Sequence, residues 1–164
     1  MTVAIVYYIR LAPVYPENNR DHTLVLKSAT AKHKNSTNSS GISYELINNW
    51  LYSLKNAEAV TGIYDGEDES SFVQLGDNAG EVPAFVKYTD ENFFKVFPYH
   101  FLAGKPFTKA DRVSGIRNAV ITDSYARRIF GKSEGAVGKT FSLNFVNTKV
   151  VGVVQSGSFL TKTS

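Results

Sequence analysis

The sequence predicts a domain of the α+β class, in which a mixed or antiparallel sheet carries two to four short helices, as one unit or as two small subdomains. The 164 residues are 43% hydrophobic and 13% aromatic, which is enough to bury a core. Nine tyrosines and eleven phenylalanines favour a β-rich packing surface. The order of periodic segments, one strand, one helix and then three strands, indicates an α+β layer.

The first third of the chain predicts a strand, a loop and an amphipathic helix. Residues 21–32, DHTLVLKSATAK, have the period-two character of a strand. The polar stretch 33–41, HKNSTNSSG, ends in glycine and predicts a loop. Residues 43–54 have Ser43 as the cap of a helix that should pack on the sheet. Its apolar stripe consists of Ile47, Trp50, Leu51 and Leu54.

Three short strands are predicted next, over residues 57–65, 70–76 and 82–89, because apolar and β-branched residues there are separated by acidic, glycine-containing turns. A short helix from Thr89 to Phe97 should then end before Pro98. We expect this helix to bury Phe93, Phe94 and Phe97.

The last third begins with a predicted turn at residues 101–107, FLAGKPF, and one helical turn at 108–112. A buried strand is expected over 118–122, NAVIT, leading into a helix over 123–130. The chain then closes with a predicted hairpin, KTFSLNF and TKVVGVV, that turns around Val146-Asn147.

Two Gly-Lys sequences raise the question of nucleotide binding. Residues 126–133 fit the relaxed phosphate-loop pattern A-x-x-x-x-G-K-S. In a phosphate loop, however, a strand leads into the glycines and a helix follows them. Here the helix 123–130, capped by Thr122 or Asp123, precedes Gly131, which is expected to stop it. The second sequence, at 138–140, is followed by a strand pattern, so both are predicted to be turns.

No catalytic, cofactor-binding or metal-binding group is predicted. The absence of cysteine excludes disulfides, thiol catalysis and cysteine-ligated metals. His22, His33 and His100 lie far apart in the sequence without ligand spacing. The acidic run 65–69 fails the calcium-loop pattern because its glycine stands at the second position and Gly76 stands where a glutamate is required. No G-x-S-x-G nucleophile motif is present.

Charge is distributed unevenly along the chain, although the net charge is only +3. Residues 56–91 contain nine acids and one base, whereas residues 105–139 contain eight bases and three acids. A nucleic-acid surface on the basic segment is one alternative, but the bases are not interleaved with aromatic residues on one face. We expect no nucleic-acid partner.

The second half of the chain contains an ordered set of motifs. They are VKYTDENFFKVFPYHFLAGKPFTKAD, NAVITDSYARRIFGKSEGAVGKTF and KVVGVV, within residues 86–154. This set resembles the periplasmic core region of MacB-like ABC transporter permeases, a group that includes MacB, LolC, LolE and FtsX relatives. Residues 12–26, APVYPENNRDHTLVL, also look like the segment after the first membrane helix of such permeases.

The resemblance implies a MacB-like periplasmic core fold and a set of structural rather than ligand-binding motif positions. These are Phe93, Phe94, Gly104, Pro106, Phe107, Arg128, Phe130, Gly131, Gly138, Lys139 and Gly152.

Functionally, the resemblance implies a non-catalytic domain, residues 1–164, lying outside the cytoplasm of a bacterial inner-membrane permease, with flanking transmembrane helices beyond this chain. ATP would be hydrolysed in a separate cytoplasmic ABC ATPase, and this domain would relay the motion to a periplasmic partner or an exported substrate. The implied partners are that ATPase, a second permease copy, and a periplasmic adaptor, lipoprotein or peptide substrate. The alternative from another class is a small soluble nucleotide-binding enzyme, suggested only by the Gly-Lys sequences.

Overall fold

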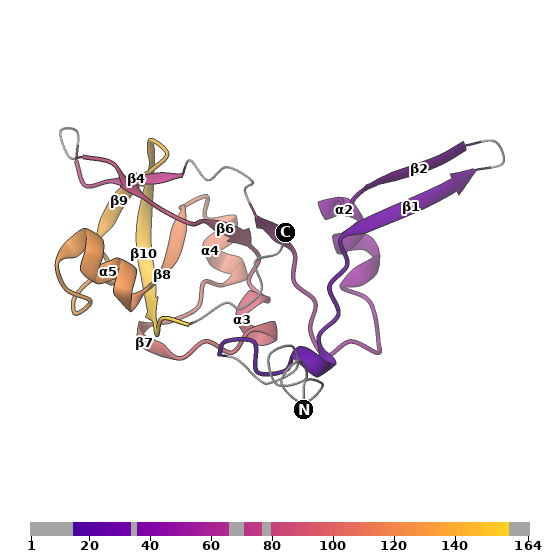
Figure 1. Ribbon diagram of the computed structural model, residues 1–164, viewed down its shortest axis with the longest axis horizontal. Helices are drawn as coiled ribbons and strands as arrows, with labels where there is room; N and C mark the ends of the chain where they lie inside the picture. Colours follow the sequence, from indigo (N-terminus) through magenta and orange to yellow (C-terminus); the bar gives the residue numbers. More distant parts are fainter. Residues whose placement is uncertain (1–14, 34–35, 66–70, 77–79, 158–164) are drawn as a thin grey trace, which may run out of the picture.

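The computed structural model describes residues 15–33, 36–65, 71–76 and 80–157. Most of the acidic run 65–69 lies outside these residues. The described chain forms a sheet-bearing body and a separate hairpin that projects from it (Figure 1). The predicted α+β class with mixed sheets and short helices is confirmed.

A six-stranded sheet forms the centre of the body. Its longest strand, β10, pairs antiparallel with β9 and β7 and parallel with β8, while β4 joins β9 to β5. Because three strands bond to β10, it is the element that holds the sheet together. The strands are β4 (Phe72–Gln74), β5 (Val82–Pro83), β7 (Phe101–Gly104), β8 (Asn118–Thr122), β9 (Thr140–Leu143) and β10 (Val146–Val154).

The core lies between this sheet and helix α5 (Asp123–Phe130). Thr122 caps the helix, its Oγ1 accepting the Tyr125 N–H at 3.2 Å, and Gly131 ends it in the left-handed conformation at φ 79°. The predicted helix, its cap and its glycine stop are therefore confirmed. The buried cluster consists of Val73, Ile121, Ala126, Ile129, Ala136, Phe141, Val150 and Val153.

The predicted C-terminal hairpin is confirmed as β9–β10, but its turn lies at Asn144-Phe145, two residues before the predicted position. Both turn residues have positive φ, 46° and 66°. Asparagine tolerates this conformation, and the mirror-image turn that it allows matches the twist of a hairpin.

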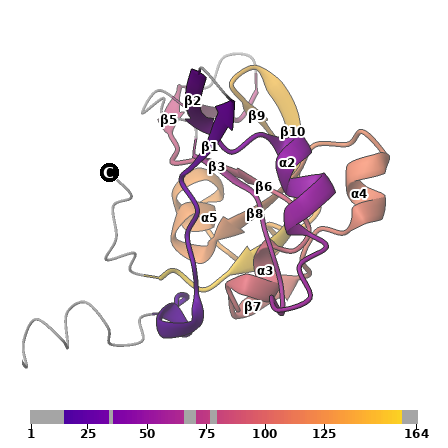
Figure 2. The same cartoon turned by 90° about the vertical axis from the view of Figure 1, so that its right-hand side faces the viewer.

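Smaller elements surround the sheet. On one side of β8 lies α5 and on the other α4 (Lys109–Val113), as both views show (Figures 1 and 2). The remaining elements are η1 (Arg20–His22), β1 (Ser28–His33), β2 (Ser36–Gly41), α2 (Tyr44–Leu46), the π-helical turn η2 (Ile47–Leu51), β3 (Ile63–Asp65), β6 (Lys87–Thr89) and α3 (Phe93–Val96).

The loop prediction for 33–41 was wrong, because Ser36–Gly41 forms β2, which pairs antiparallel with β1. This hairpin is built by backbone hydrogen bonds, which a polar sequence supplies as well as an apolar one, so period-two hydrophobicity did not mark it. The strand predicted at 21–32 forms only from Ser28. Before it, Leu24 is 91% exposed instead of packed.

The helix predicted over 43–54 forms with Ser43 as its cap, the Leu46 N–H donating to Ser43 Oγ at 3.2 Å. It ends at Leu51 and its stripe is not buried as predicted, since Trp50 is 71% and Leu54 51% exposed. Within the stripe, Ile47 lies next to Gly62.

Four boundaries also differ from the prediction. The turn predicted at 101–107 begins as strand β7, because Phe101–Gly104 bonds to β10 despite its glycine. The helix predicted from Thr89 begins only at Phe93, since Asp90 Oδ1 accepts the Asn92 N–H and holds the preceding backbone in a turn. The strand predicted from residue 57 forms only at Ile63–Asp65, and the one predicted over 82–89 divides into β5 and β6.

Candidate functional site

The entry and exit of the described chain lie side by side at one end of the sheet, which we call the base: Tyr15, Pro16, Tyr99, His100 and Gln155–Gly157 (Figure 1). The Tyr15 hydroxyl donates to the Gln155 carbonyl at 3.3 Å and accepts the His100 N–H at 2.8 Å. The Gln155 N–H donates to the His100 carbonyl at 2.9 Å, which continues the pairing past the end of β10. Tyr15, at the entry of the described chain, is thus joined both to Gln155 at its exit and to His100, the residue directly before β7.

Aromatic side chains support the base from within. Tyr99 contacts Tyr15 edge-on at 5.9 Å and stacks on Phe93 at the same distance between ring centroids. Phe94 contacts Phe101 at 5.1 Å and Phe107 at 5.3 Å. Burial raises the pKa of the Tyr99 hydroxyl, so this ring stays neutral in ordinary buffers. Edge-on and stacked aromatic pairs stabilise a fold beyond the contribution of the apolar area that they bury. The cluster therefore supports the Tyr15 ring rigidly.

A close backbone approach fixes β7 on β10 above the base. Gly104 pairs with Gly152, and a Cβ at residue 104 would stand 2.1 Å from the Val151 carbonyl oxygen. At Gly152, a Cβ would stand 2.7 Å from the Phe101 ring. Neither position has room for a side chain, which explains why glycine stands at these two positions of the motif set.

Just past β10, Ser156 joins the exit of the chain to the first turn of α5. Asp123 Oδ1 accepts the Ser156 N–H at 2.8 Å and the Ser156 hydroxyl at 2.6 Å, and Arg127 donates to Oδ2 at 2.8 Å. The Ser156 hydroxyl bond, followed by the Arg127 interaction, lowers the pKa of Asp123 to about 2. Among the described residues, Ser156 bonds directly to Asp123, whereas a nucleophilic triad places a histidine between the serine and the acid.

A buried aspartate connects the helical segment α2–η2 to the body. Asp90 accepts hydrogen bonds from the Tyr52 hydroxyl, from Thr61 Oγ1 at 2.9 Å, from the Gly62 N–H at 2.7 Å and from the Asn92 N–H at 2.8 Å. These donors come from three separate segments of the chain. Asp90 is only 8% exposed, and its bonds replace the water that a buried carboxylate needs.

The two Gly-Lys sequences are turns. Gly131 donates its N–H to the Arg127 carbonyl at 2.9 Å, and Gly138 donates to the Val150 carbonyl at 2.8 Å. Lys139 lies over the Phe130 ring, 4.6 Å from its centroid. The glycine N–H groups that a phosphate would need are thus bound to protein carbonyls, and the first turn adjoins the negative end of α5.

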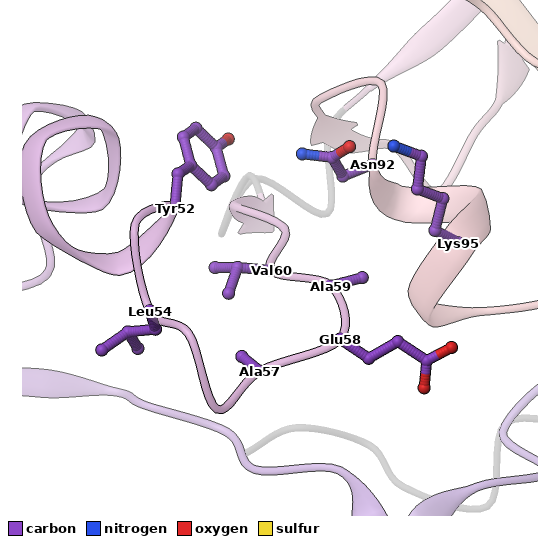
Figure 3. A pocket seen from close by; sticks show the side chains of 8 residues that line it. All are labelled: Tyr52, Leu54, Ala57, Glu58, Ala59, Val60, Asn92 and Lys95. Atoms are coloured by element: carbon purple, nitrogen blue, oxygen red, sulfur yellow. The ribbon is translucent and has the colours of Figure 1, made fainter.

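Six of the motif positions fall into two groups. Phe93, Phe94 and Phe107 belong to the aromatic cluster, and Phe130, Gly138 and Lys139 meet where the second turn packs beside α5. Pro106 lies half-buried between β7 and Phe107, and Arg128 is exposed on α5 near Tyr125. None of the eleven positions lines the hollow between the end of η2 and α3 (Figure 3).

Several bases of the 105–139 segment are bound within the domain. Arg127 pairs with Asp123, Arg112 pairs with Glu91 at 3.3 Å, and Lys139 contacts Phe130. Three of the eight bases of this segment therefore have partners within the domain. Over residues 15–33, 36–65, 71–76 and 80–157, histidines and acids form no group of three or more that could hold a metal ion.

Sequence reasoning missed Tyr15, Asp90 and Ser156. The signal for Asp90 was its place between a strand and a helix, where an aspartate commonly accepts N–H groups of the next turn. Nothing local marked Tyr15 or Ser156, because their partners stand 85 to 140 and 32 to 33 residues away.

Comparisons with known proteins agree with this arrangement. A family model described as the MacB-like periplasmic core domain matches residues 1–163. No curated protein sequence matches the chain. Helices of membrane-spanning length and hydropathy do not occur in the described residues.

Two transporter domains are among the solved structures that share the fold. The periplasmic region of MacB from Actinobacillus actinomycetemcomitans aligns with a TM-score of 0.53 and 22% identity, over 65% of this chain and 47% of that one. The extracellular domain of the noncanonic ABC-type transporter YknZ from Gram-positive bacteria aligns with a TM-score of 0.54 and 19% identity, over 70% of this chain and 58% of that one. The chain thus corresponds to about half the length of each.

Proposed function

Since the chain belongs to the family of MacB-like periplasmic core domains, we propose that it is a non-catalytic extracytoplasmic domain of an ABC transporter permease. Its task is to relay ATP-driven motion of membrane helices to an exported substrate or a periplasmic partner. The ATP is hydrolysed by a separate cytoplasmic ATPase, and a second permease copy completes the transporter.

One observation supports the relay above the others: entry and exit of the described chain are joined at the base through Tyr15 and Gln155. Any displacement applied to both ends there acts on β10, since Gln155 follows that strand directly. Strand β10 then reaches the turn Asn144-Phe145 at the opposite end of the sheet, which we call the distal turn. The long strand and its three bonded neighbours form a stiff path from base to distal turn.

The rigid motif positions fit the same role. Glycines at close backbone approaches and phenylalanines in a packed cluster keep the sheet from deforming, so the domain moves as a body. We propose that the eleven motif positions are structural and contact no cofactor.

The side of the membrane is tested by a single cysteine at the exposed Lys132 position, in a permease whose other cysteines, where it has any, are replaced by serine. A membrane-impermeant maleimide should label Lys132→Cys in intact cells with a permeabilised outer envelope, as fast as in lysed cells. Labelling only after lysis would overturn the extracytoplasmic placement. Lys132 lies in the first Gly-Lys turn. Labelling from outside would therefore also show that this turn has no access to ATP in the cytoplasm.

A binding measurement addresses the nucleotide alternative. Calorimetry with ATP and with GTP should detect no saturable binding to the domain, and the double variant Lys132→Ala, Lys139→Ala should give the same trace. Binding that disappears in the double variant would support the nucleotide-binding enzyme instead.

A further inference from the structure

The hairpin of β1 and β2 stands apart from the six-stranded sheet (Figure 1). Its strands pair antiparallel from Ser28 and Gly41 at the foot to His33 and Ser36 near the tip. No other described strand bonds to this pair, and no other described element packs extensively on it. A two-stranded hairpin without further strands or a packed helix is only marginally stable in water. The hairpin therefore lacks the support of neighbouring elements in the part of the chain that the structure describes.

Strand β2 presents an open backbone edge. In an antiparallel pair, every second residue bonds to the partner strand, and the residues between them direct their N–H and C=O groups outward. Residues 36–40 of β2 thus carry outward groups to which none of the described strands is bonded. An edge of this kind is a template for a strand of another chain.

The two strands of the hairpin differ in how their edges are protected. Natural proteins shield open edges with proline and with charged residues, lysine above all. At the end of the six-stranded sheet, β5 contains Pro83, and in the hairpin β1 contains Lys32. Strand β2, with the sequence STNSSG, contains neither a charge nor a proline. The composition therefore suits β1 to be an outer strand and β2 to be an inner one.

We propose that β2 pairs antiparallel with β2 of a second copy of this chain. The product is a four-stranded sheet, in which the two β2 strands lie inside and the two β1 strands lie outside. Antiparallel pairing of a strand with its own copy is closed by a two-fold axis, so both copies use the same surface. The backbone hydrogen bonds of the shared edge supply the affinity. The pairing rests on the proposed function only for the presence of a second permease copy.

The second copy is favoured over other occupants by the distribution of charge. Pairing through β2 leaves Lys32 of each copy on an outer strand, whereas pairing through β1 would place the bases of both copies in one interface. A strand from an unrelated protein would itself become the new outer edge. A second hairpin, by contrast, brings its own lysine-bearing β1 to that position.

Disulfide trapping in the intact permease tests this pairing. The chain contains no cysteine, and any cysteines elsewhere in the permease are replaced by serine. Residues 36–40 are replaced by cysteine one at a time, and oxidised membranes are analysed for covalent dimers. We expect the yield to peak at one position or two adjacent positions, because only residues beside the two-fold axis meet their own copies within the roughly 4–7 Å that a disulfide allows. Two residues from the axis, the copies are about 13 Å apart along the strand.

Ala31→Cys is the matched control, because Ala31 lies opposite Asn38 on β1. It should give no covalent dimer, since the proposed sheet separates the two β1 strands by three strand spacings, about 14 Å. The proposal is overturned if Ala31→Cys cross-links as well as the best β2 position. It is also overturned if no β2 position cross-links in a permease that still hydrolyses ATP, or if β2 cross-links to a different protein identified by mass spectrometry.

Added charge provides an independent measurement. Asn38→Lys places like charges on the facing strands and should lower the cross-link yield of the best remaining β2 cysteine by about tenfold. Ala31→Lys adds the same charge to the outer strand and should leave that yield unaltered. An equal response to the two lysines contradicts the pairing. The Lys132→Cys labelling reports the side of the membrane whether or not two copies are linked, so failure of this pairing and failure of the proposed function are distinguishable.

Discussion

At the scale of single residues, the most consequential side chain is Asp90, a carboxylate that the sequence analysis did not name. Its four donors come from the end of η2, from the approach to β3 and from the start of α3. No apolar contact could join these three segments with such directional specificity, because each bond fixes an angle as well as a distance.

We expect Asp90→Asn to lower the free energy of unfolding by about 2–3 kcal/mol. The substituted amide presents one oxygen and one NH₂ group, so donors that now bond to a carboxylate oxygen lose their acceptor. Urea denaturation followed by circular dichroism measures the change. Glu134→Gln removes an exposed carboxylate and should stay within about 0.5 kcal/mol of the parent. Equal midpoints for the two variants would show that Asp90 does not hold these segments together.

Asp123 makes the stability depend on pH in a predictable direction. Its pKa is about 2 in the folded state, against 3.8 for an unperturbed aspartate, with the Ser156 hydroxyl bond as the largest cause. Since the folded pKa is the lower one, the contribution of Asp123 is complete above pH 3.8 and is lost as the pH falls toward 2.

The comparison between the parent and Asp123→Asn isolates this effect from other acids. We expect the parent to be more stable above about pH 5, and the difference to shrink steadily on acidification. Thermal unfolding in a series of buffers provides the measurement. A difference that is constant over the acidic range would mean that the charge of Asp123 is irrelevant to the bonds that it accepts.

At the scale of elements, the approach of β7 to β10 is the most demanding contact in the sheet. Gly104 has a φ of 71°, and an added methyl group would lie 2.1 Å from the Val151 oxygen. Relief requires β7 to separate from β10, which would also disturb Phe101 and the aromatic cluster behind the base.

Gly104→Ala is expected to destabilise the domain by at least about 3 kcal/mol. Gly115 is a matched control, since it has the same φ of 71° but no atom within 4 Å of the place that an added methyl group would take. Its replacement by alanine should cost only the backbone strain, about 1–2 kcal/mol. Denaturation midpoints of the two variants separate steric exclusion from strain. If both variants lose the same free energy of unfolding, the close approach of β7 to β10 is not the reason for glycine at residue 104.

The elements that sequence reasoning predicted correctly are those whose signals are local. Helix α5 was found with its cap and stop because Thr122, the apolar spacing and Gly131 are contiguous. The β1–β2 hairpin was missed because polar residues form it and hydrophobic alternation marks only strands on a core. The exposed Trp50 shows the converse error, in which helical spacing was present but no sheet covered the stripe.

The candidate site was less predictable than the fold. The glycines and phenylalanines of the motif set could be named in advance because they follow each other in a recognisable order. The base could not be named in advance. Tyr15 and Gln155 are 140 residues apart in the sequence and become neighbours only when the whole domain has folded.

At the scale of the whole molecule, the proposed function follows from where the described chain enters and leaves. The base joins both ends, and the distal turn lies at the other end of β10. We expect Tyr15→Phe, which deletes the two bonds of the hydroxyl, to lower stability by about 1–2 kcal/mol.

In the intact permease, Tyr15→Phe should also reduce ATP-dependent export while the ATPase rate is retained, because motion at the membrane is then transmitted less faithfully to β10. Tyr64→Phe deletes a hydroxyl on a residue that is 67% exposed and serves as the control for both assays. If the Tyr15→Phe permease is expressed normally and its export is unimpaired, the base takes no part in transmitting the motion.

The most direct test of the relay is a distance measurement on the transporter itself. A spin label at Asn147→Cys, exposed beside the distal turn, reports the separation between the two permease copies. We predict that ATP shifts the distance distribution, and that a variant ATPase unable to bind ATP abolishes the shift. A distribution that stays the same during ATP-driven export would contradict the claim that this domain carries motion away from the membrane.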